Sequence, residues 1–290
     1  MCALLFGFVL PVAVAVSGGS PAVAADPPAM KIGLPESMFS GVPQALVQPA
    51  ARPFQTMLEK QAGLTGEVVV ARDHADLAKQ LKDGKLDIAV FHGFEYAWVK
   101  QNPELIPLVV TNPSVKLQAC LVVNTTSKAK GPHELKGEAV AVPGGTKAHC
   151  RLYFDQLKTN LPEGCCGVAK LKTTSIEEAI DAVADDTCPA VLVDLATLTT
   201  YKKLKPGAGA CLKVLDESMA FPAGVVVYRK DGFKPADVQK VRDGLVKCVG
   251  TPEGQRLTSL WRLKGFEEPN AAYQAELDKC LKAYPAPKEK

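Results

Sequence analysis

Three short segments of the chain have the glycines and helix-start positions that suit an anion. They are Ser37 to Gly41, His92 to Tyr96 and Gly144 to His149, and each lies between an apolar stretch and a helical pattern. In open α/β sheets, ligands bind beyond the carboxyl ends of strands, where loops lead into helix N-termini. Backbone N–H groups there favour a negative charge, and Gly144-Gly145 allows close approach of a ligand to the backbone. The segments predict a site for a small oxyanion.

The polar residues in and near these segments also have structural interpretations, which the sequence leaves open. His92 and His149 either contact a ligand or pack as ordinary structural histidines, and the charge of His92 would respond to pH near neutrality. Thr146 is either a ligand contact or the N-cap of the next helix. Asp194 ends an apolar stretch. It either caps the helix at 195–204 or accepts a hydrogen bond from a protonated oxygen or an amine of the ligand.

Strand and helix patterns alternate around these residues. The predicted strands are 30–34, 67–71, 85–91, 105–111, 119–124, 138–142, 189–193, 212–216 and 224–229. The predicted helices are 50–63, 75–82, 149–160, one that Ser175 caps, 195–204 and two or three between 235 and 283. This alternation predicts parallel α/β sheets. Because the order of strand, turn and helix restarts near residue 138, we also expect a second lobe.

Composition and charge narrow the class of protein. The chain has 290 residues, 47% of them hydrophobic and 22% charged, which suits a folded protein of two lobes. A net charge of +3 without a basic run makes nucleic acid an unlikely partner. The apolar stretch at 3–16 is too short to span a bilayer and leads to the small residues 22–24. We therefore expect a signal peptide at 1–24 and a periplasmic or otherwise extracytoplasmic mature protein.

Four sequence motifs resemble those of one protein family. The chain is similar to the phosphate/phosphite/phosphonate-binding family of extracytoplasmic solute-binding proteins, which serve ABC importers and belong to the type 2 periplasmic binding proteins. The motifs are Asp87-Ile88-Ala89-Val90, His92-Gly93-x-x-Tyr96, Leu135-Lys136-Gly137-x-x-Val140-Ala141-Val142-Pro143-Gly144-Gly145-Thr146 and Glu217-Ser218-x-x-Phe221-Pro222.

The resemblance implies a two-lobed α/β fold whose lobes close on a ligand held in the cleft between them. We place lobe 1 at 29–118 plus 214–290 and lobe 2 at 124–212, with crossovers near 121–123 and within 212–228. The implied partners are a small oxyanion and an ABC permease, and the protein is expected to act as a monomer without a cofactor or metal. The candidate ligand-binding residues are Ser37, Phe39, Ser40, His92, Gly93, Tyr96, Gly145, Thr146, Lys147, His149 and Asp194.

Two of these residues carry a specific expectation from the family. The family's matching tyrosine reaches the ligand from the first lobe, which Tyr96 would do here unless it packs against the sheet. The family's matching loop brings serine and threonine hydroxyls to the phosphoryl oxygens. Here that loop has one hydroxyl, Thr146, followed by Lys147. The identity of the oxyanion is therefore left open.

Eight cysteines remain after removal of residues 1–24, and an even number behind an export signal predicts disulfides. No C-x2-C pair is present, which argues against zinc. We expect bonds within single lobes, which would leave the hinge free, and a further bond near the crossover. The expected pairs are Cys248 with Cys280, Cys188 with Cys165 or Cys166, and Cys120 with Cys211.

Two other classes of function are alternatives to a solute-binding protein, namely an enzyme and a sensory or partner-binding protein. An enzyme is disfavoured because His149 and Cys150 are neighbours in sequence, and a helix would point them about 100° apart. The chain also has no nucleophile elbow, Walker loop or H-E-x-x-H motif. A two-lobed sensory or partner-binding protein that does not serve transport is the alternative that stays open.

Overall fold

The computed structural model describes residues 30–39, 42–63, 65–135, 137–161, 167–169, 175–232 and 234–287. Several predicted features lie outside these residues. They are the signal peptide at 1–24, Ser40 of the first candidate loop, and Cys165 and Cys166.

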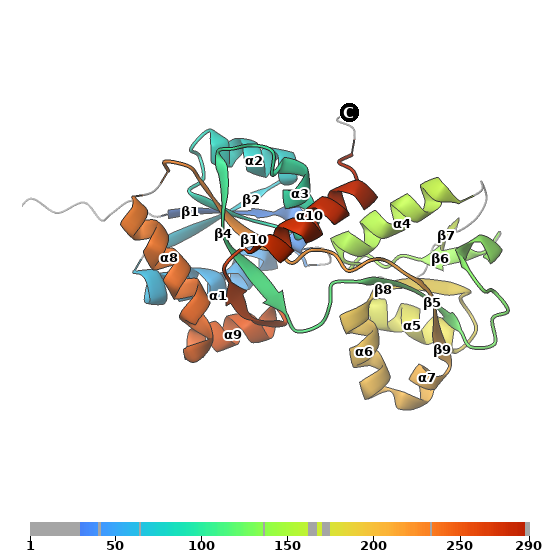
Figure 1. The fold of residues 1–290 in the computed structure, drawn as a ribbon. Helices are drawn as coiled ribbons and strands as arrows, with labels where there is room; N and C mark the ends of the chain where they lie inside the picture. The colour runs from blue at the N-terminus through green and yellow to red at the C-terminus, as the bar shows by residue number, and fades with distance from the viewer. Residues whose placement is uncertain are drawn as a thin grey trace, which may run out of the picture.

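The described residues form two α/β lobes, each built on one sheet (Figure 1). The first sheet has the strand order β11-β4-β10-β3-β1-β2. Its strands are β1 (Met30–Pro35), β2 (Gly66–Ala71), β3 (Ile88–Phe91), β4 (Leu105–Pro113), β10 (Val225–Arg229) and β11 (Leu263–Glu267). The helices of this lobe are η1 (Glu36–Phe39), α1 (Gln44–Ala62), α2 (His74–Lys82), α3 (Gly93–Val99), α8 (Pro235–Lys247), η3 (Cys248–Gly250), α9 (Pro252–Leu260) and α10 (Ala271–Ala283).

The second lobe is built from the middle of the chain. Its sheet has the order β7-β6-β8-β5-β9. The strands are β5 (Ala119–Asn124), β6 (Ala139–Ala141), β7 (Gly167–Ala169), β8 (Ala190–Asp194) and β9 (Leu212–Glu217). The helices are η2 (Pro132–Glu134), α4 (Ala148–Asn160), α5 (Ile176–Ala184), α6 (Leu195–Leu204) and α7 (Pro206–Ala210).

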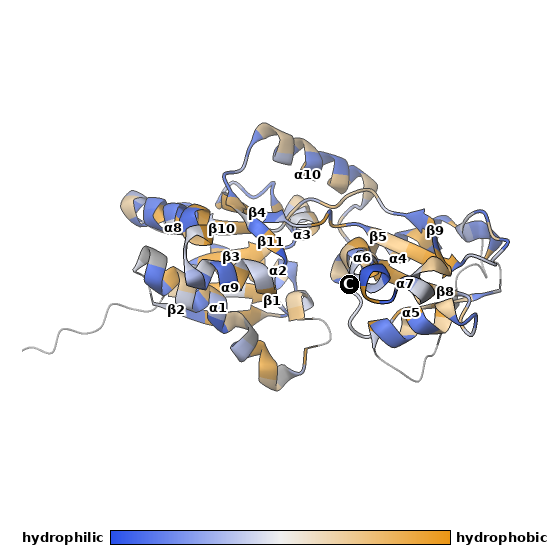
Figure 2. Ribbon diagram, turned by 90° about the horizontal axis from the view of Figure 1, so that it is seen from below, coloured by the Kyte–Doolittle hydropathy of each residue, from blue (hydrophilic) through white to orange (hydrophobic). Residues whose placement is uncertain are grey.

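Both sheets are buried between helices, and this burial makes the cores. In the first lobe, α1, α8 and α9 pack on one face of the sheet, and α2, α3 and α10 on the other. In the second lobe, α4 covers one face and α5 and α6 the other. Figure 2 shows hydrophobic strands inside each lobe and hydrophilic residues on the outer faces of the helices. In the described part of the chain, no helix is long and apolar enough to cross a bilayer.

Local sequence signals account for where several helices begin. Ser175 caps α5 as predicted, because its hydroxyl accepts a hydrogen bond from the Glu178 N–H at 3.4 Å. Helix α1 begins earlier than predicted, at Gln44, and contains Pro49 and Pro53. Proline disfavours a helix interior. The apolar side of α1 is buried against the sheet, and this burial stabilises the longer helix. Helix propensity alone does not include that contribution.

The strand directions differ from the prediction of parallel sheets. Strands β1, β2 and β3 are parallel, but β10 runs antiparallel to both β3 and β4. In the second sheet, β5 is antiparallel to β8 and β9. Strands β5 and β10 are the ones that the chain enters from the other lobe. A strand entered in that way need not follow the direction set by local strand and helix units, and both sheets are therefore mixed.

The chain passes between the sheets at residues 114–118 and 218–224. The predicted crossover at 121–123 lies inside β5, and β9 belongs wholly to the second sheet. The two crossing segments are hydrogen-bonded to each other. The Gln118 side-chain Nε2 donates to the Ser218 carbonyl at 2.7 Å, and the Phe221 N–H donates to the Leu117 carbonyl at 2.7 Å. The segments therefore form one short double connection.

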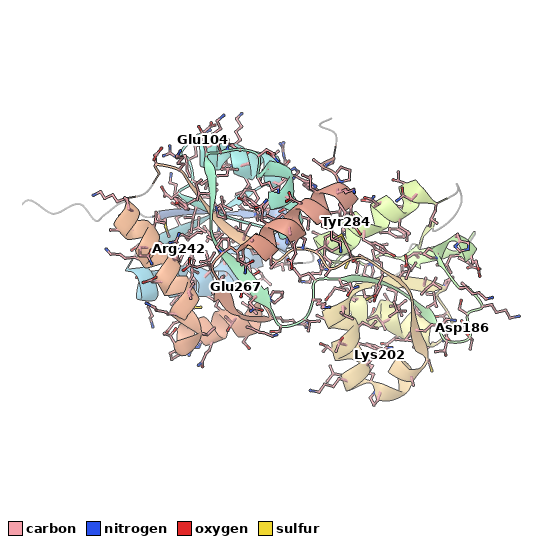
Figure 3. The ribbon with its side chains drawn as sticks, viewed as in Figure 1. Glu104, Asp186, Lys202, Arg242, Glu267 and Tyr284 are labelled. Atoms are coloured by element: carbon pink, nitrogen blue, oxygen red, sulfur yellow. The ribbon has the colours of Figure 1, made fainter. Side chains whose placement is uncertain are left out.

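Helix α10 reaches across this connection to the second lobe (Figure 1). Its C-cap residue, Tyr284, is labelled in Figure 3 and packs against Phe221 with ring centroids 4.8 Å apart. The Trp98 Nε1–H of α3 donates to the Tyr284 carbonyl at 2.8 Å. The C-terminal end of α10 is thus anchored both to the first lobe and to the second crossing segment.

The disulfides expected among described residues do not form. Cys120, Cys150, Cys188, Cys211, Cys248 and Cys280 are all free thiols. Cys248 packs with α8 and α9 on one face of the first sheet, whereas Cys280 lies on α10 with Phe221 and Tyr284 on the other side. A disulfide needs the two Cα atoms within about 7 Å of each other, and a sheet separates this pair.

The other two expected cysteine pairs are also corrected in part. Cys120 is buried in the core beneath α5, but Cys211 is exposed just after α7. Their expected position near the crossover therefore did not predict proximity of the two thiols. Cys188 is a buried free thiol, and both of its expected partners lie outside the described residues.

Candidate functional site

Residues from the two lobes meet beside the crossing segments. A continuous series of aromatic contacts joins them. His92 stacks on Phe94 with ring centroids 5.3 Å apart, and Phe94 contacts Phe221 of the second crossing segment at 5.9 Å. Phe221 in turn contacts His149 of lobe 2 at 5.5 Å. Two of the three predicted segments, those of His92 and His149, are therefore brought together by the fold.

On the lobe 1 side, a buried carboxyl group ties the first two predicted segments together. Glu95 of α3 is 5% exposed. Its side chain accepts a hydrogen bond from the Ser37 hydroxyl at 3.1 Å and another from the His92 backbone N–H at 3.3 Å. Burial raises the pKa of this carboxyl group, and the bonds from Ser37 and His92 oppose the increase. Glu95 thus positions both loops at the end of the sheet.

Gly93 serves close packing of α3 against the hinge. A Cβ atom placed there would lie 2.3 Å from the Pro222 carbonyl oxygen and 2.4 Å from that of Ala223. Such distances are far shorter than van der Waals contact, so only glycine lets α3 begin at this point. The residue was predicted as a ligand contact, and the structure gives it a packing role against the second crossing segment.

Phe39 and Tyr96, two further predicted ligand contacts, belong to the core of lobe 1. Phe39 is 7% exposed and packs with α1 and β1. Tyr96 packs with Phe91, and its hydroxyl is 3.5 Å from the Leu105 carbonyl oxygen. Burial raises the pKa of Tyr96 to about 12. The ring of Tyr96 fills the space between the sheet and α10, which is the packing alternative that the sequence left open.

On the lobe 2 side, Arg151 holds the loop that carries Thr146. Its guanidinium group donates to the carbonyls of Pro143 and Gly144 at 3.0 Å each, and to that of Thr146 at 3.1 Å. These three carbonyl groups of the loop therefore already accept hydrogen bonds from Arg151. The N-cap of α4 is Lys147, so of the two alternatives for Thr146 the capping role is not adopted. Thr146 is 1% exposed, and its side chain does not cap the helix.

The two histidines are held in the neutral state at ordinary pH. Burial is the main cause, and it lowers the pKa of His149 and that of His92 to about 4 each. The positive charge of Lys147 acts in the same direction on both rings. Each ring also lies near a backbone carbonyl that favours the protonated form, Ser37 for His92 and Gln118 for His149.

Asp194 combines a structural role with an electrostatic effect on His149. Its carboxylate accepts hydrogen bonds from the Thr197 N–H at 3.0 Å and the Thr197 hydroxyl at 2.5 Å, so it caps α6. It is only 8% exposed. Its negative charge favours the protonated form of His149, against the larger effect of burial. The capping role that the sequence left open is therefore present, and the carboxylate also acts on the histidine.

Three buried polar atoms in this group have no hydrogen-bond partner among the described residues. They are Nε2 of His92, Oγ1 of Thr146 and Nε2 of His149. Buried polar atoms in folded proteins are almost always paired, so these three atoms are candidates for ligand contacts. Gly145 and Lys147 lie in the same loop as Thr146, which completes the set of predicted lobe 2 residues.

Sequence reasoning missed the residues that support this group. Glu95 was missed because a charged residue on a helix is usually solvent-facing. Gln118 comes from the first crossing segment, which was expected at 121–123 and lies at 114–118. Phe221 lies in a predicted motif and within the predicted second crossover, but it was not assigned a contact at the site. The Glu95 signal was nevertheless present, since a carboxylate three residues after an N-cap position is a capping pattern.

A separate open cavity of about 500 Å³ lies between α6 and α9. Its lining includes Ser114 and Val115 of the first crossing segment, Thr199 and Thr200 of α6, and Arg262 after α9. None of the predicted site residues lines it. Within the described residues, no group of three or more histidine, cysteine or acidic side chains could hold a metal ion.

Two mixed sheets, two crossing segments and polar groups gathered from both lobes define a two-lobed ligand-binding protein. The model of the family described as "ABC transporter, phosphonate, periplasmic substrate-binding protein" matches residues 37–273, which is most of the chain. The chain belongs to this family of ABC-transporter substrate-binding proteins.

Solved structures share the fold at low sequence identity. A Xanthomonas citri protein bound to ATP superposes with a TM-score of 0.65 and 15% identity, covering 88% of this chain and 96% of that one. A binding protein of an ABC phosphonate transporter from Pseudomonas aeruginosa superposes with a TM-score of 0.61 and 16% identity, covering 88% of this chain and 86% of that one. PhnD1 from Prochlorococcus marinus in complex with methylphosphonate superposes with a TM-score of 0.61 and 13% identity, covering 88% of this chain and 97% of that one. A comparison with curated proteins finds no match.

Proposed function

We propose that the mature protein captures a small phosphorus oxyanion between its lobes, outside the cytoplasm, and delivers it to the permease of an ABC importer. Membership of the substrate-binding family supports the transport role. The unpartnered group of His92, Thr146 and His149 supports the position of the site, and this is the observation on which the proposal depends. The protein works as a monomer, because each chain supplies both walls of the site.

The loop before α4 supplies the donors for the ligand. Arg151 occupies the loop carbonyls of Pro143, Gly144 and Thr146. The Thr146 hydroxyl and the N–H groups at the start of α4 are then available to ligand oxygens, and Lys147 adds a positive charge. On the opposite side, His92 is presented by the bonds of Glu95 to its backbone and to Ser37.

The ligand class follows from this chemistry and agrees with the neighbours. Methylphosphonate in the Prochlorococcus marinus protein and ATP in the Xanthomonas citri protein both contain tetrahedral phosphorus with charged oxygens. Phosphate, phosphite and small phosphonates are therefore the proposed ligands of this chain. The site binds without converting its ligand. Cys150 is the thiol closest in sequence to His149, and burial raises its pKa well above the usual value, so the nucleophilic thiolate is disfavoured.

Binding requires the lobes to separate and close again. Thr146 and the Nε2 atoms of both histidines are buried in the present arrangement. A ligand enters only if the lobes move about the crossing segments, and it stabilises the closed form by its preference for that form.

The test is isothermal calorimetry on residues 25–290 with methylphosphonate, phosphite and inorganic phosphate. Thr146→Ala is expected to weaken binding about ten- to a hundredfold, because a hydrogen bond to a charged group contributes roughly 1.5–3 kcal/mol. Thr199→Ala is the matched control, since Thr199 is exposed in the same lobe and bonds only to the Leu195 carbonyl of its own helix. Equal affinity of both variants and the wild type would place the site elsewhere.

Failure of all three anions to bind would favour the sensory or partner-binding alternative. A pull-down with the permease in the presence and absence of methylphosphonate separates the two further. Transport predicts that ligand strengthens the association with the permease.

A further inference from the structure

We propose that Tyr284, at the C-terminal end of α10, is a positioning residue of the oxyanion site, and that it acts through Phe221 of the second crossing segment. The inference rests on the proposed function and adds a residue that lies outside all three predicted segments. By this inference, α10 clasps the connection between the lobes and stabilises the arrangement in which the site is closed.

Four residues around the second crossing segment form a closed series of contacts. The ring centroid of Phe94 lies 5.9 Å from that of Phe221 and 5.3 Å from that of Trp98. The centroids of Phe221 and Tyr284 are 4.8 Å apart. The Trp98 Nε1–H closes the series by donating to the Tyr284 carbonyl at 2.8 Å. Each of the four residues is therefore held by two of the others, so displacing one loosens its neighbours.

Two further contacts lead from this series to the candidate ligand residues. The ring of His92 stacks on Phe94 with an interplanar angle of 7°. The ring of His149 lies 5.5 Å from Phe221 between centroids. The Nε2 atom of each histidine has no partner among the described residues. Phe221 is thus the residue through which Tyr284 reaches the lobe 2 histidine.

Helix α10 is fixed to lobe 1, whereas its C-terminal end packs with lobe 2 (Figure 1). Tyr273 and Leu277 of α10 lie in a core cluster of lobe 1, and the Tyr273 hydroxyl donates to the Ala223 carbonyl at 2.9 Å. Tyr284 is buried in the core cluster that contains Leu121 of β5. Rotation of the lobes about the crossing segments must therefore rearrange the contacts of Tyr284.

These contacts are made in the arrangement that buries the unpartnered atoms of Thr146, His92 and His149. They stabilise that arrangement over one in which the lobes are separated. When the binding-competent form is less populated, the apparent affinity falls by the same factor. Loss of one buried aromatic pair is expected to weaken binding about tenfold.

The experiment is calorimetry with methylphosphonate, phosphite and inorganic phosphate on residues 25–290 of the wild type and three variants. Tyr284→Ala removes the ring that packs on Phe221 and is expected to weaken binding about tenfold. Tyr284→Phe keeps the ring and is expected to restore the affinity to within about threefold of the wild type. Met57→Ala is the matched control, because Met57 of α1 is fully buried on the other face of the first sheet. It is expected to lower stability and leave the affinity unchanged.

A second measurement reports position and needs no ligand. The chain has four histidines, so their ring signals in an NMR spectrum can be assigned from single glutamine variants. Displacement of Phe221 changes the ring current that acts on His149. The His149 signals of the ligand-free protein are therefore expected to shift in Tyr284→Ala and to keep their place in Met57→Ala.

The outcomes separate this inference from the function on which it rests. If the wild type binds an anion and Tyr284→Ala binds it within about threefold, the inference is overturned and oxyanion capture stands. Equal losses of affinity in Tyr284→Ala and Met57→Ala would overturn it too, because general destabilisation would explain both. Unmoved His149 signals in Tyr284→Ala would refute the action through Phe221. If none of the three anions binds the wild type, the proposed function fails, and this inference fails with it.

Discussion

The two halves of the site are built in different ways. In lobe 1, His92 is positioned by side-chain contacts, with Glu95 bonded to its backbone and to Ser37, and Phe94 stacked on its ring. In lobe 2, the loop of Thr146 is held through its backbone carbonyls by Arg151. One half depends on a buried acid and the other on an exposed arginine at the edge of the loop.

We expect the two halves to differ in role, with the lobe 1 half holding the site in place and the lobe 2 half recognising the ligand. The lobe 1 half is packed against the hinge, because Gly93 leaves no room between α3 and the carbonyls of Pro222 and Ala223. The lobe 2 half carries the hydroxyl of Thr146, the charge of Lys147 and the side chains of His149 and Asp194. We expect changes in lobe 1 to act mainly on folding and hinge geometry, and changes in lobe 2 to act mainly on ligand choice.

The largest effect is expected at Gly93, the second residue of the lobe 1 segment. Gly93→Ala should destabilise the protein by about 3 kcal/mol, because its Cβ would overlap backbone atoms that cannot move aside. Gly145→Ala is the matched control. Its Cβ would lie 3.5 Å from the Ile176 side chain, which is an ordinary contact. Urea denaturation of both variants tests the comparison, and equal stability would contradict the packing role of Gly93.

The second prediction uses pH to weigh the two histidines. The pKa of each is about 4 in the folded protein, below the value of 6.5 for an unperturbed ring. Below pH 6.5 the unfolded chain takes up protons that the folded protein does not. Stability is therefore complete above that pH and is lost as the pH falls toward about 4.

The histidine variants assign this loss to each lobe. His92→Gln and His149→Gln should each reduce the fall in unfolding free energy between neutral and acid pH by about 2 kcal/mol. Urea titrations at a series of pH values measure the effect. A wild-type slope that survives both substitutions would mean that other groups cause it.

The third prediction tests the clamp on the lobe 2 loop. Arg151→Met removes the guanidinium bonds to the carbonyls of Pro143, Gly144 and Thr146. Because Arg151 is exposed, its loss should cost about 1 kcal/mol of stability. Affinity for methylphosphonate should fall about tenfold as the loop N–H groups lose their orientation. Arg151→Lys, with fewer donors, should lie between the wild type and the methionine variant. Unchanged affinity in Arg151→Met would refute the positioning role.

The smallest effect is expected at Ser37 in lobe 1. Ser37→Ala removes the hydrogen bond to Glu95, which should cost about 1 kcal/mol or less of stability. Affinity for methylphosphonate should fall less than about threefold, since Ser37 acts on the site only through Glu95. Thermal unfolding and calorimetry on the same sample give both values. A larger loss of affinity would show that Ser37 contacts the ligand itself.

Several features were accessible from the sequence because they depend on local chemistry. The position of α4 after the turn at 143–146, the cap at Ser175 and the strand that ends at Asp194 follow from short-range patterns. The candidate residues Thr146, His149 and His92 were also identified, because ligands gather where strands lead into helices. The fold then linked two of them, His92 and His149, through the rings of Phe94 and Phe221.

Other features depended on contacts between distant segments. Tyr96 and Phe39 lie in the predicted loops, yet their rings fill the core of lobe 1, and no local pattern distinguishes the two positions. The expected bond between Cys248 and Cys280 was wrong for a similar reason, since sharing a lobe does not place two residues on the same face of a sheet.

The sequence by itself determined the alternation of elements, the restart that makes a second lobe and the loops that face each other. Each of these follows from hydrophobic spacing, turn residues and helix caps within short windows of the chain. Only the tertiary structure decided the antiparallel strands, the positions of the crossing segments and which polar atoms are left without a partner. Those depend on burial, and burial is set by what the rest of the chain places against a residue.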